Sequence, residues 1–284
     1  MSKITQIFIF IILLALNVSA QGDSLTFVTA DWHSLEIAKG IVWKQYLFKG
    51  TLFGSNQNIN ILEVKKSKRI SFEFGYETKK LKLTSKFGKE SDALAAVNGT
   101  FFNTKEGGSV DFLKAYDLVV HHNQLKDGKR EFHQKAAVVL KNSTLRIEKW
   151  NGNDEWETHL HAKGVMVSGP LLIFHKGQEP LDSASFNLTR HPRTALAITN
   201  SHQILLITVD GRNENAAGMS LFELRNILRW LNAGMGINLD GGGSTTLWIY
   251  NQPANGVVNY PCDNRKWDHT GERRVANVIM VKKR

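Results

Sequence analysis

The sequence predicts an α+β (or mixed α/β) fold: a strand-rich single domain with a mixed sheet and few helices. Three observations support this prediction. The segments "INILEV" (59–64) and "ISFEF" (70–74) place every second residue on one face, as half-buried strands do. Further short apolar runs recur along the chain, while residues 220–233 alone have clear helical spacing. Hydrophobic residues make up 42% of the 284 residues, which is typical of a globular protein with a sizeable core.

The first twenty residues predict an export signal that is not part of the fold. Lys3 precedes an apolar run over residues 7–16, and residues 18–20 (Val-Ser-Ala) are small enough for a signal peptidase. This run is short for a membrane span, which needs about 20 residues. We therefore expect cleavage after Ala20, with an uncleaved anchor as the alternative. The mature protein would be secreted or periplasmic, without stable membrane insertion, and residues 21–284 would form one domain.

Charge and cysteine content narrow the class of protein. Cys262 is the sole cysteine, so an exported chain must be held together by packing rather than by an internal disulfide. The formal net charge of +10 favours an anionic partner. Because no helix-turn-helix, zinc-finger or RNA-binding motif is present, we do not expect nucleic acid to be that partner.

Most of the remaining elements are predicted as strands. A hairpin is expected from residues 136–140 and 144–150, with its turn at Asn142-Ser143. The other strand-like runs are 92–103, 164–174, 193–199, 204–212 and 275–281. For the helix, Ser220 and Glu223 form a capping box, and we expect Gly234 and Gly236 to end it.

Two strand-like runs end in the same way, with an acid before glycine. "LLITVDGR" (205–212) contains Asp210-Gly211, and "GINLDGGGS" (236–244) contains Asp240 followed by Gly241–Gly243. With the helix between them, the two runs have the length of a β-α-β unit around residues 204–250. If the strands are parallel neighbours, both acids lie at one sheet edge, where ligands bind in such sheets. The glycines would let a ligand approach the backbone amides, whereas the alternative is a pair of tight turns capped by Asp.

Other candidate site residues also lie beside predicted strand ends. They are Asn98, Ser168, Gly169, Arg193, Thr194, Arg212, Ser244 and Arg273. The arginines among them suit bidentate contacts to phosphate.

Taken together, six segments resemble the phosphodiester glycosidase family, and in particular its exported bacterial members. They follow one another in the family's order from Ser91 to the end of the chain, whereas residues 114–163 match poorly. The segments are "AVNGTFFN" (96–103), "VSGPLLI" (167–173), "RTALAIT" (193–199), "VDGRNENAAGMSLFEL" (209–224), "NLDGGGSTTL" (238–247) and "ERRVANVIMV" (272–281).

The resemblance implies hydrolysis of a glycosyl-phosphate or glycan phosphodiester, with attack at the anomeric carbon and no required cofactor. On this hypothesis Asp210 and Asp240 supply the carboxylates, in unresolved order. Arg193 and Arg212 hold the phosphate, helped by the amides of Gly241, Gly242 and Gly243. The remaining predicted site residues are Asn98, Ser168 and Ser244, which orient hydroxyls or phosphate; Glu272, a reserve carboxylate; Arg273, a reserve phosphate ligand; and Gly169, Thr194 and Gly211, which line the site.

Two other functions remain open from the sequence. The paired aspartates could hold Ca²⁺ or Mg²⁺ in a metal-assisted phosphodiesterase that cleaves the P–O bond, although the residues identify no ligand set. The chain could instead be a non-catalytic module that binds an anionic glycan, using some of its seven tryptophans as stacking platforms.

Overall fold

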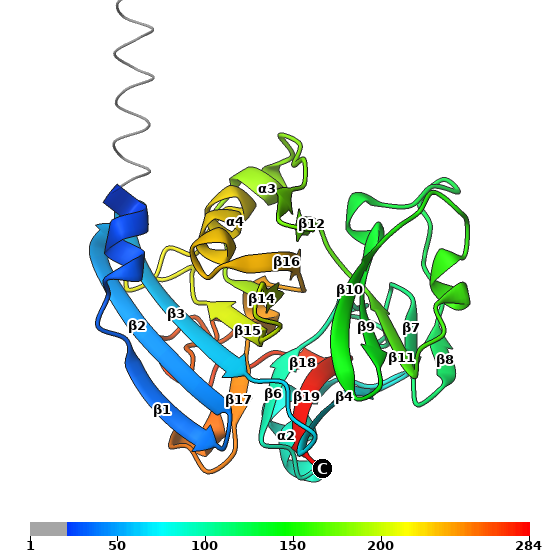
Figure 1. Cartoon of the computed structure of the whole chain (residues 1–284), viewed down its shortest axis with the longest axis horizontal. Helices are drawn as coiled ribbons and strands as arrows, with labels where there is room; N and C mark the ends of the chain where they lie inside the picture. Colours follow the sequence, from blue (N-terminus) through cyan, green and yellow to red (C-terminus); the bar gives the residue numbers. More distant parts are fainter. Residues whose placement is uncertain (1–21) are drawn as a thin grey trace, which may run out of the picture.

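The structure, a computed structural model, describes residues 22–284 and is dominated by three sheets (Figure 1). What we call the large sheet has eight strands in the order β1 (His33–Ala38), β2 (Ile41–Leu52), β3 (Ser55–Val64), β15 (Ile204–Val209), β14 (Arg193–Thr199), β16 (Ala233–Asn238), β12 (Leu171–Phe174) and β13 (Gly177–Gln178). The middle sheet has β17 (Leu247–Ile249), β6 (Ala95–Asn98), β19 (Asn277–Lys283) and β4 (Ile70–Tyr76).

The side sheet lies across the molecule from the large sheet (Figure 1). It consists of β10 (Thr144–Lys149), β9 (Ala136–Lys141), β11 (Gly164–Val167), β7 (Leu113–Ala115) and β8 (Leu118–His121). A separate small sheet is formed by β18 (Arg274–Val275) and β5 (Lys82–Leu83). The helices are α2 (Thr84–Glu90), α3 (Ser185–Leu188), α4 (Leu221–Trp230), a helical stretch over residues 22–28, and the short 3-10 turns η1 (Phe132–Gln134), η2 (Trp156–His159), η3 (Gly242–Ser244) and η4 (Ala254–Gly256).

This architecture confirms the strand-rich fold but corrects two details. Every strand pairing of the three sheets within residues 22–284 is antiparallel, so the predicted mixed sheet is wrong. β15, α4 and β16 follow in sequence as expected, but β14 lies between the two strands. Because β14 is antiparallel to both, β15 and β16 still run in the same direction and end at the same edge of the large sheet.

The capping box of α4 is confirmed, whereas its predicted end is wrong. Ser220 Oγ accepts from the Glu223 amide at 3.2 Å, and the Glu223 carboxylate accepts from the Ser220 amide at 2.9 Å. The helix stops at Trp230, and Gly234 and Gly236 belong to β16. Gly236 is needed there because a Cβ would come within 2.6 Å of Leu228 Cδ1 on the helix.

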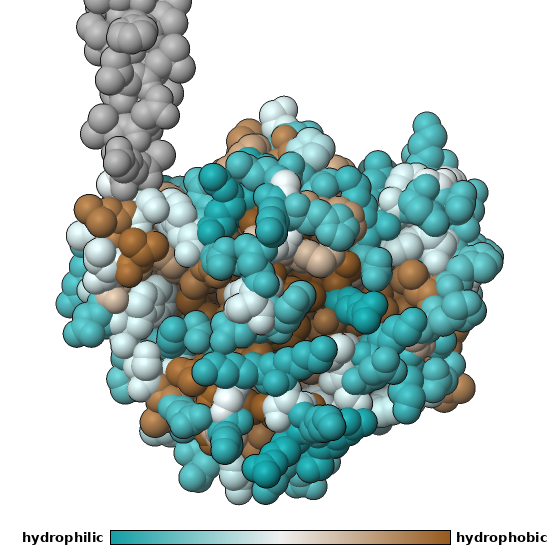
Figure 2. Space-filling view, viewed as in Figure 1, coloured by the Kyte–Doolittle hydropathy of each residue, from teal (hydrophilic) through white to brown (hydrophobic). Residues whose placement is uncertain are grey.

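The core occupies the space where the sheets face one another. Ile41 and Leu62 of the large sheet, Phe74 and Val97 of the middle sheet and Val138 of the side sheet belong to one buried cluster. The opposite face of the large sheet packs against α4 and the helical residues 22–28 (Figure 1). The face of the molecule drawn in Figure 2 is mainly hydrophilic, with hydrophobic side chains visible in its hollows. The three sheets therefore form one body, and their strand ends can contribute to a single site.

The N-terminal export prediction concerns residues outside the described range. The predicted cleavage after Ala20 falls in residues 1–21, so it stays a prediction. Among residues 22–284, no helix has both the length and the apolar character needed to cross a bilayer.

Candidate active site

Strands from the large and middle sheets converge at one edge. β15 ends there one residue before Asp210, and β16 ends two residues before Asp240. β14 begins beside them, with Arg193 paired to Val209. Asn98, at the end of β6, donates from Nδ2 to the Asp240 carbonyl at 2.7 Å. The structure therefore brings together residues that are far apart in the sequence, as the matched Asp-Gly pattern predicted.

Asn98 joins the elements that meet at this edge. Besides the bond to Asp240, its Oδ1 accepts from the Thr194 hydroxyl at 2.8 Å and from the Thr246 amide at 3.1 Å. Its side-chain amide is thus bonded to three segments: the one after β16, the one before β17, and β14. Because Asn98 is fully buried and both ends of the amide are bonded, its side chain holds the site together rather than reaching toward a sugar.

Asp240 is the most distinctive titratable group at the edge. Burial raises the pKa of its carboxyl to about 6, against the lowering effects of Ser244, the Gly241 amide and Arg273. The Asp111 carboxylate contributes to the rise. Asp240 nevertheless retains some solvent exposure. A carboxyl that changes protonation near neutral pH and is accessible to solvent is suited to acid, base or nucleophilic chemistry.

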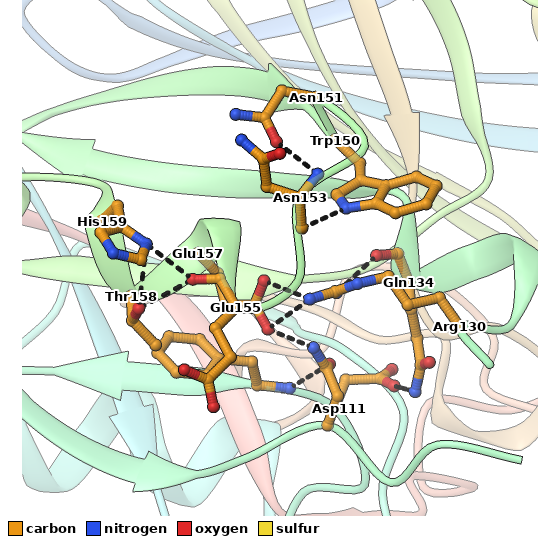
Figure 3. A network of polar contacts seen from close by, with 12 residues as sticks. Asp111, Arg130, Gln134, Trp150, Asn151, Asn153, Glu155, Glu157, Thr158 and His159 are labelled. Carbon is orange, nitrogen blue, oxygen red and sulfur yellow. Dashed lines mark hydrogen bonds and ion pairs between the residues drawn. The ribbon is translucent and has the colours of Figure 1, made fainter. Parts of the chain in front are cut away.

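Asp111 is a site residue that the sequence analysis missed. It is fully buried and accepts hydrogen bonds from Thr100 Oγ1 at 3.3 Å, His133 Nε2 at 3.2 Å and Gln134 Nε2 at 2.8 Å. A network continues from Gln134 through Arg130 to the buried Glu157 (Figure 3). The available signal was a single acid within the apolar segment 110–113, just before the region that resembled the family poorly.

Asp210 has a different environment from Asp240. Its carboxylate accepts from Asn58 Nδ2 at 2.7 Å, Asn259 Nδ2 at 2.8 Å and the Tyr260 amide at 3.1 Å. It is 1% exposed, and burial raises its pKa against these three hydrogen bonds. Because its oxygens are enclosed by protein donors, Asp210 fixes the 259–260 segment and is poorly placed to reach a substrate.

Arg193 also differs from its predicted role. The side chain is 1% exposed, Nε donates to the Met219 carbonyl at 2.8 Å, and Nη2 donates to the Phe186 and Thr189 carbonyls at 2.6 and 2.9 Å. Burial, together with the nearby Arg212, lowers its pKa to about 10. The guanidinium therefore ties the start of β14 to α3, and this geometry argues against a phosphate ligand.

Two other arginines flank the glycine turn after Asp240. A Cβ on Gly242 would lie 3.1 Å from Arg212 Nη2, and one on Gly243 would lie 2.6 Å from Arg273 Nη2. Arg212 is exposed, while Arg273 is half-buried and pairs with Asp263 at 2.6 Å. Glycine at these positions lets both guanidinium groups approach the turn, together with the Asp263 carboxylate, whose Oδ1 would lie even closer than Arg273 Nη2 to a Cβ on Gly243. Two arginines and one carboxylate therefore lie at the turn, and the excess charge beside Asp240 is positive.

The backbone amides of this turn contribute less than the sequence suggested. The Gly241 amide donates to Asp240 Oδ1 at 2.9 Å, and the Gly242 amide donates to the Pro192 carbonyl at 2.9 Å. An anion would have to displace these bonds to reach either amide. We therefore assign the positive character of the site to the arginine side chains.

The other predicted residues mainly support the framework. The Glu272 carboxylate accepts from the Ser85 amide at 2.9 Å, in the first turn of α2. This bond gives Glu272 a structural role, whereas the sequence suggested a reserve catalytic carboxylate. Ser168 donates to the Asn238 carbonyl at 3.2 Å, and Gly211 is packed so closely that a Cβ would lie 2.8 Å from Gly218. Gly169 precedes Pro170, and Ser244 is buried next to the Asp240 carboxyl, whose pKa it lowers.

The possible metal ion stays a prediction. Within residues 22–284, no three His, Cys, Asp or Glu side chains are grouped so that they could hold a metal ion together.

The fold and site define a protein that places one accessible carboxyl beside two cations at the edge of an antiparallel sheet. The phosphodiester glycosidase family model matches residues 91–282, so the chain belongs to the phosphodiester glycosidase family. This confirms the resemblance inferred from the six sequence segments.

Similar proteins cover different shares of the chain. The N-acetylglucosamine-1-phosphodiester alpha-N-acetylglucosaminidases of Bos taurus and Mus musculus are 33% and 32% identical over 111 and 108 residues. Each alignment covers 37% of this chain and 20% and 19% of those proteins, so the match spans about a fifth of their length.

Two solved structures share the fold. The zebrafish N-acetylglucosamine-1-phosphodiester alpha-N-acetylglucosaminidase catalytic domain, auto-inhibited by its pro-peptide, has a TM-score of 0.67 at 19% identity and covers 89% of this chain and 88% of its own. A hypothetical protein from Synechocystis has a TM-score of 0.62 at 16% identity, and the match covers 90% of this chain and 64% of that one.

Proposed function

We propose that the protein hydrolyses a sugar-1-phosphodiester at the glycosidic C–O bond and releases a free sugar and a phosphomonoester. The observation that carries this proposal is the Asp240 carboxyl, with a pKa of about 6, beside Arg212 and Arg273 in a member of this family. The family membership supports the reaction class, and the geometry supports the roles that we propose for the residues.

The arginines match the charge that develops in this reaction. As the C–O bond breaks, the phosphate leaving group gains negative charge, and nearby cations stabilise the transition state more than the bound substrate. Arg212 and Arg273 provide these cations. A phosphomonoester is already a weak base, so its departure needs little protonation.

Asp240 then acts in its ionised form. A carboxylate attacks the anomeric carbon directly or removes a proton from the attacking water. Burial, with a smaller contribution from the Asp111 carboxylate, raises the pKa of Asp240 and keeps that carboxylate basic. Asp210 positions the 259–260 segment, so the proposal gives the carboxylate chemistry to Asp240 and a supporting role to Asp210.

The bond that breaks is tested with isotope labelling. The purified protein is incubated with a panel of sugar-1-phosphodiesters in ¹⁸O-labelled water, and the products are analysed by mass spectrometry. We expect the label in the sugar, because water adds to the anomeric carbon. Label in the phosphomonoester would overturn the proposal in favour of P–O cleavage.

The assignment of Asp240 is tested with a matched pair of variants. Asp240→Asn should reduce turnover by about two to four orders of magnitude, as expected when a catalytic carboxylate is removed. Asp154→Asn, an exposed residue, is the control and should turn over normally. Near-normal turnover by Asp240→Asn would contradict the assignment.

Export is part of the proposal. We expect the mature protein to begin at Gln21 and to be secreted or periplasmic. N-terminal sequencing of the protein from its natural host measures this, and an intact Met1 terminus would contradict it.

A further inference from the structure

We propose that the pocket beside Asp111 and His133 is the subsite for the sugar ring, so that the substrate lies across Asp240 with its phosphate toward Arg212 and Arg273. This inference rests on the proposed function and adds the direction in which the substrate binds. The pocket encloses about 330 Å³, within the range of small-molecule sites, about 300–1,000 Å³. Its lining residues include Phe101, Phe132, His133, Pro170 and Phe186.

Covalent and hydrogen-bonded connections place this pocket next to the reacting edge. Phe101 directly follows Thr100, whose hydroxyl bonds to Asp111, and His133 also bonds to Asp111. Pro170 lies in the segment whose Gly169 carbonyl accepts from Asn238, two residues before Asp240, at 2.9 Å. The residues that line the pocket are therefore linked to the Asp240 segment through these hydrogen bonds and short stretches of chain.

Aromatic faces dominate the pocket. The Phe101 ring centroid lies 4.8 Å from that of His133 and 6.3 Å from that of Phe186. Phe132 and Phe186 are 37% and 41% exposed, so their rings are accessible to a ligand in the pocket. Exposed aromatic rings in a pocket provide faces against which the C–H groups of a pyranose can pack.

The polar groups of the pocket favour a neutral ligand with hydroxyl groups. Glu131 and Asp182 are among its lining residues. These carboxylates can accept hydrogen bonds from hydroxyls but repel a phosphate group. Arg212 and Arg273, beside the glycine turn, offer the opposite charge. The pocket and the glycine turn therefore differ in charge in the way that the two halves of a glycosyl phosphodiester differ.

Two fragments of the substrate test this direction without turnover. Binding of free monosaccharides (N-acetylglucosamine, glucose and mannose) and of inorganic phosphate is measured by titration calorimetry or NMR. Phe132→Ala should weaken binding of the best sugar at least fivefold and leave the phosphate Kd within twofold. Arg212→Ala should weaken phosphate at least tenfold and leave the sugar Kd within twofold.

Two further variants serve as controls. Tyr250→Ala removes an aromatic ring that is 63% exposed and lies outside the pocket, and should change neither Kd. Phe132→Leu keeps an apolar side chain without the aromatic face, and should weaken sugar binding even if Phe132→Ala folds poorly.

Three results would overturn the inference. They are no binding of any sugar in the panel, sugar binding that falls with Arg212→Ala but not with Phe132→Ala, and sugar binding unaffected by both Phe132 variants. Failure of the proposed function has a different signature, since P–O cleavage in labelled water would leave the binding pattern of the two fragments intact.

Discussion

Replacing Asp240 by asparagine should make the protein more stable as it becomes less active. In the native state the carboxyl has a pKa of about 6, against the ordinary value of 3.8 for an aspartate, so the folded protein binds its proton more tightly than the unfolded chain does. Stability therefore falls as pH rises between these values. By linkage, the group destabilises the fold by roughly 1 kcal/mol at pH 4.5 and roughly 3 kcal/mol at pH 7.5. Asparagine cannot ionise, so it removes this destabilisation of the fold, and it keeps an oxygen that can accept from the Gly241 amide.

The assay is denaturant unfolding of wild type and Asp240→Asn at both pH values. The stability advantage of the variant should widen by about 2 kcal/mol between pH 4.5 and pH 7.5. Because the comparison is a difference between two proteins, the titration of groups that do not interact with Asp240 cancels. An advantage that stays constant with pH, or one that shrinks, would refute the view that Asp240 is a destabilised, functional carboxyl.

Four further outcomes follow from the site. The kcat/KM of wild type should rise with pH through a midpoint near 6, because Asp240 must be ionised; a profile that falls over this range would instead make it the acid. Arg212→Ala should lower kcat/KM for phosphodiesters at least tenfold, whereas Arg229→Ala, an exposed residue on α4, should leave it unchanged. Asp210→Ala should cost roughly 2–4 kcal/mol in the free energy of unfolding, because three donors lose their acceptor; a chemical-denaturation midpoint equal to wild type would contradict this. Gly243→Ala should reduce turnover with a small change in melting temperature, because its Cβ would meet both Asp263 Oδ1 and, at 2.6 Å, Arg273 Nη2 and so displace this ion pair; normal turnover would show that the position of the Arg273–Asp263 pair is not needed.

Local patterns predicted the framework of the site well. The strands 193–199 and 204–209 and the capped start of α4 depend on residues that are neighbours in sequence, so alternation and capping chemistry could identify them. The same patterns placed Asp210 and Asp240 at one edge. They could not show that β14 lies between β15 and β16, because strand order depends on contacts between distant segments.

The roles of individual side chains were harder to predict, because they depend on burial. Asp210 and Asp240 look equivalent in sequence, yet one is enclosed by Asn58, Asn259 and the Tyr260 amide while the other keeps access to solvent. Arg193 resembles a phosphate ligand until the backbone carbonyls around it are known. Asp111 was missed because its importance comes from partners that its neighbours in the chain do not reveal.

The pocket next to Asp111 and the carboxyl of Asp240 come from different parts of the chain. Phe132 and His133 lie in η1, on the loop that leads into the side sheet, whereas Asp240 and its glycine turn extend from the large sheet. If the pocket holds the sugar, substitutions at Glu131, Phe132 and His133 would change which sugar is accepted without altering the glycine turn after Asp240. Under the proposed arrangement, this division would let natural selection exchange one substrate for another while the chemistry is inherited unchanged.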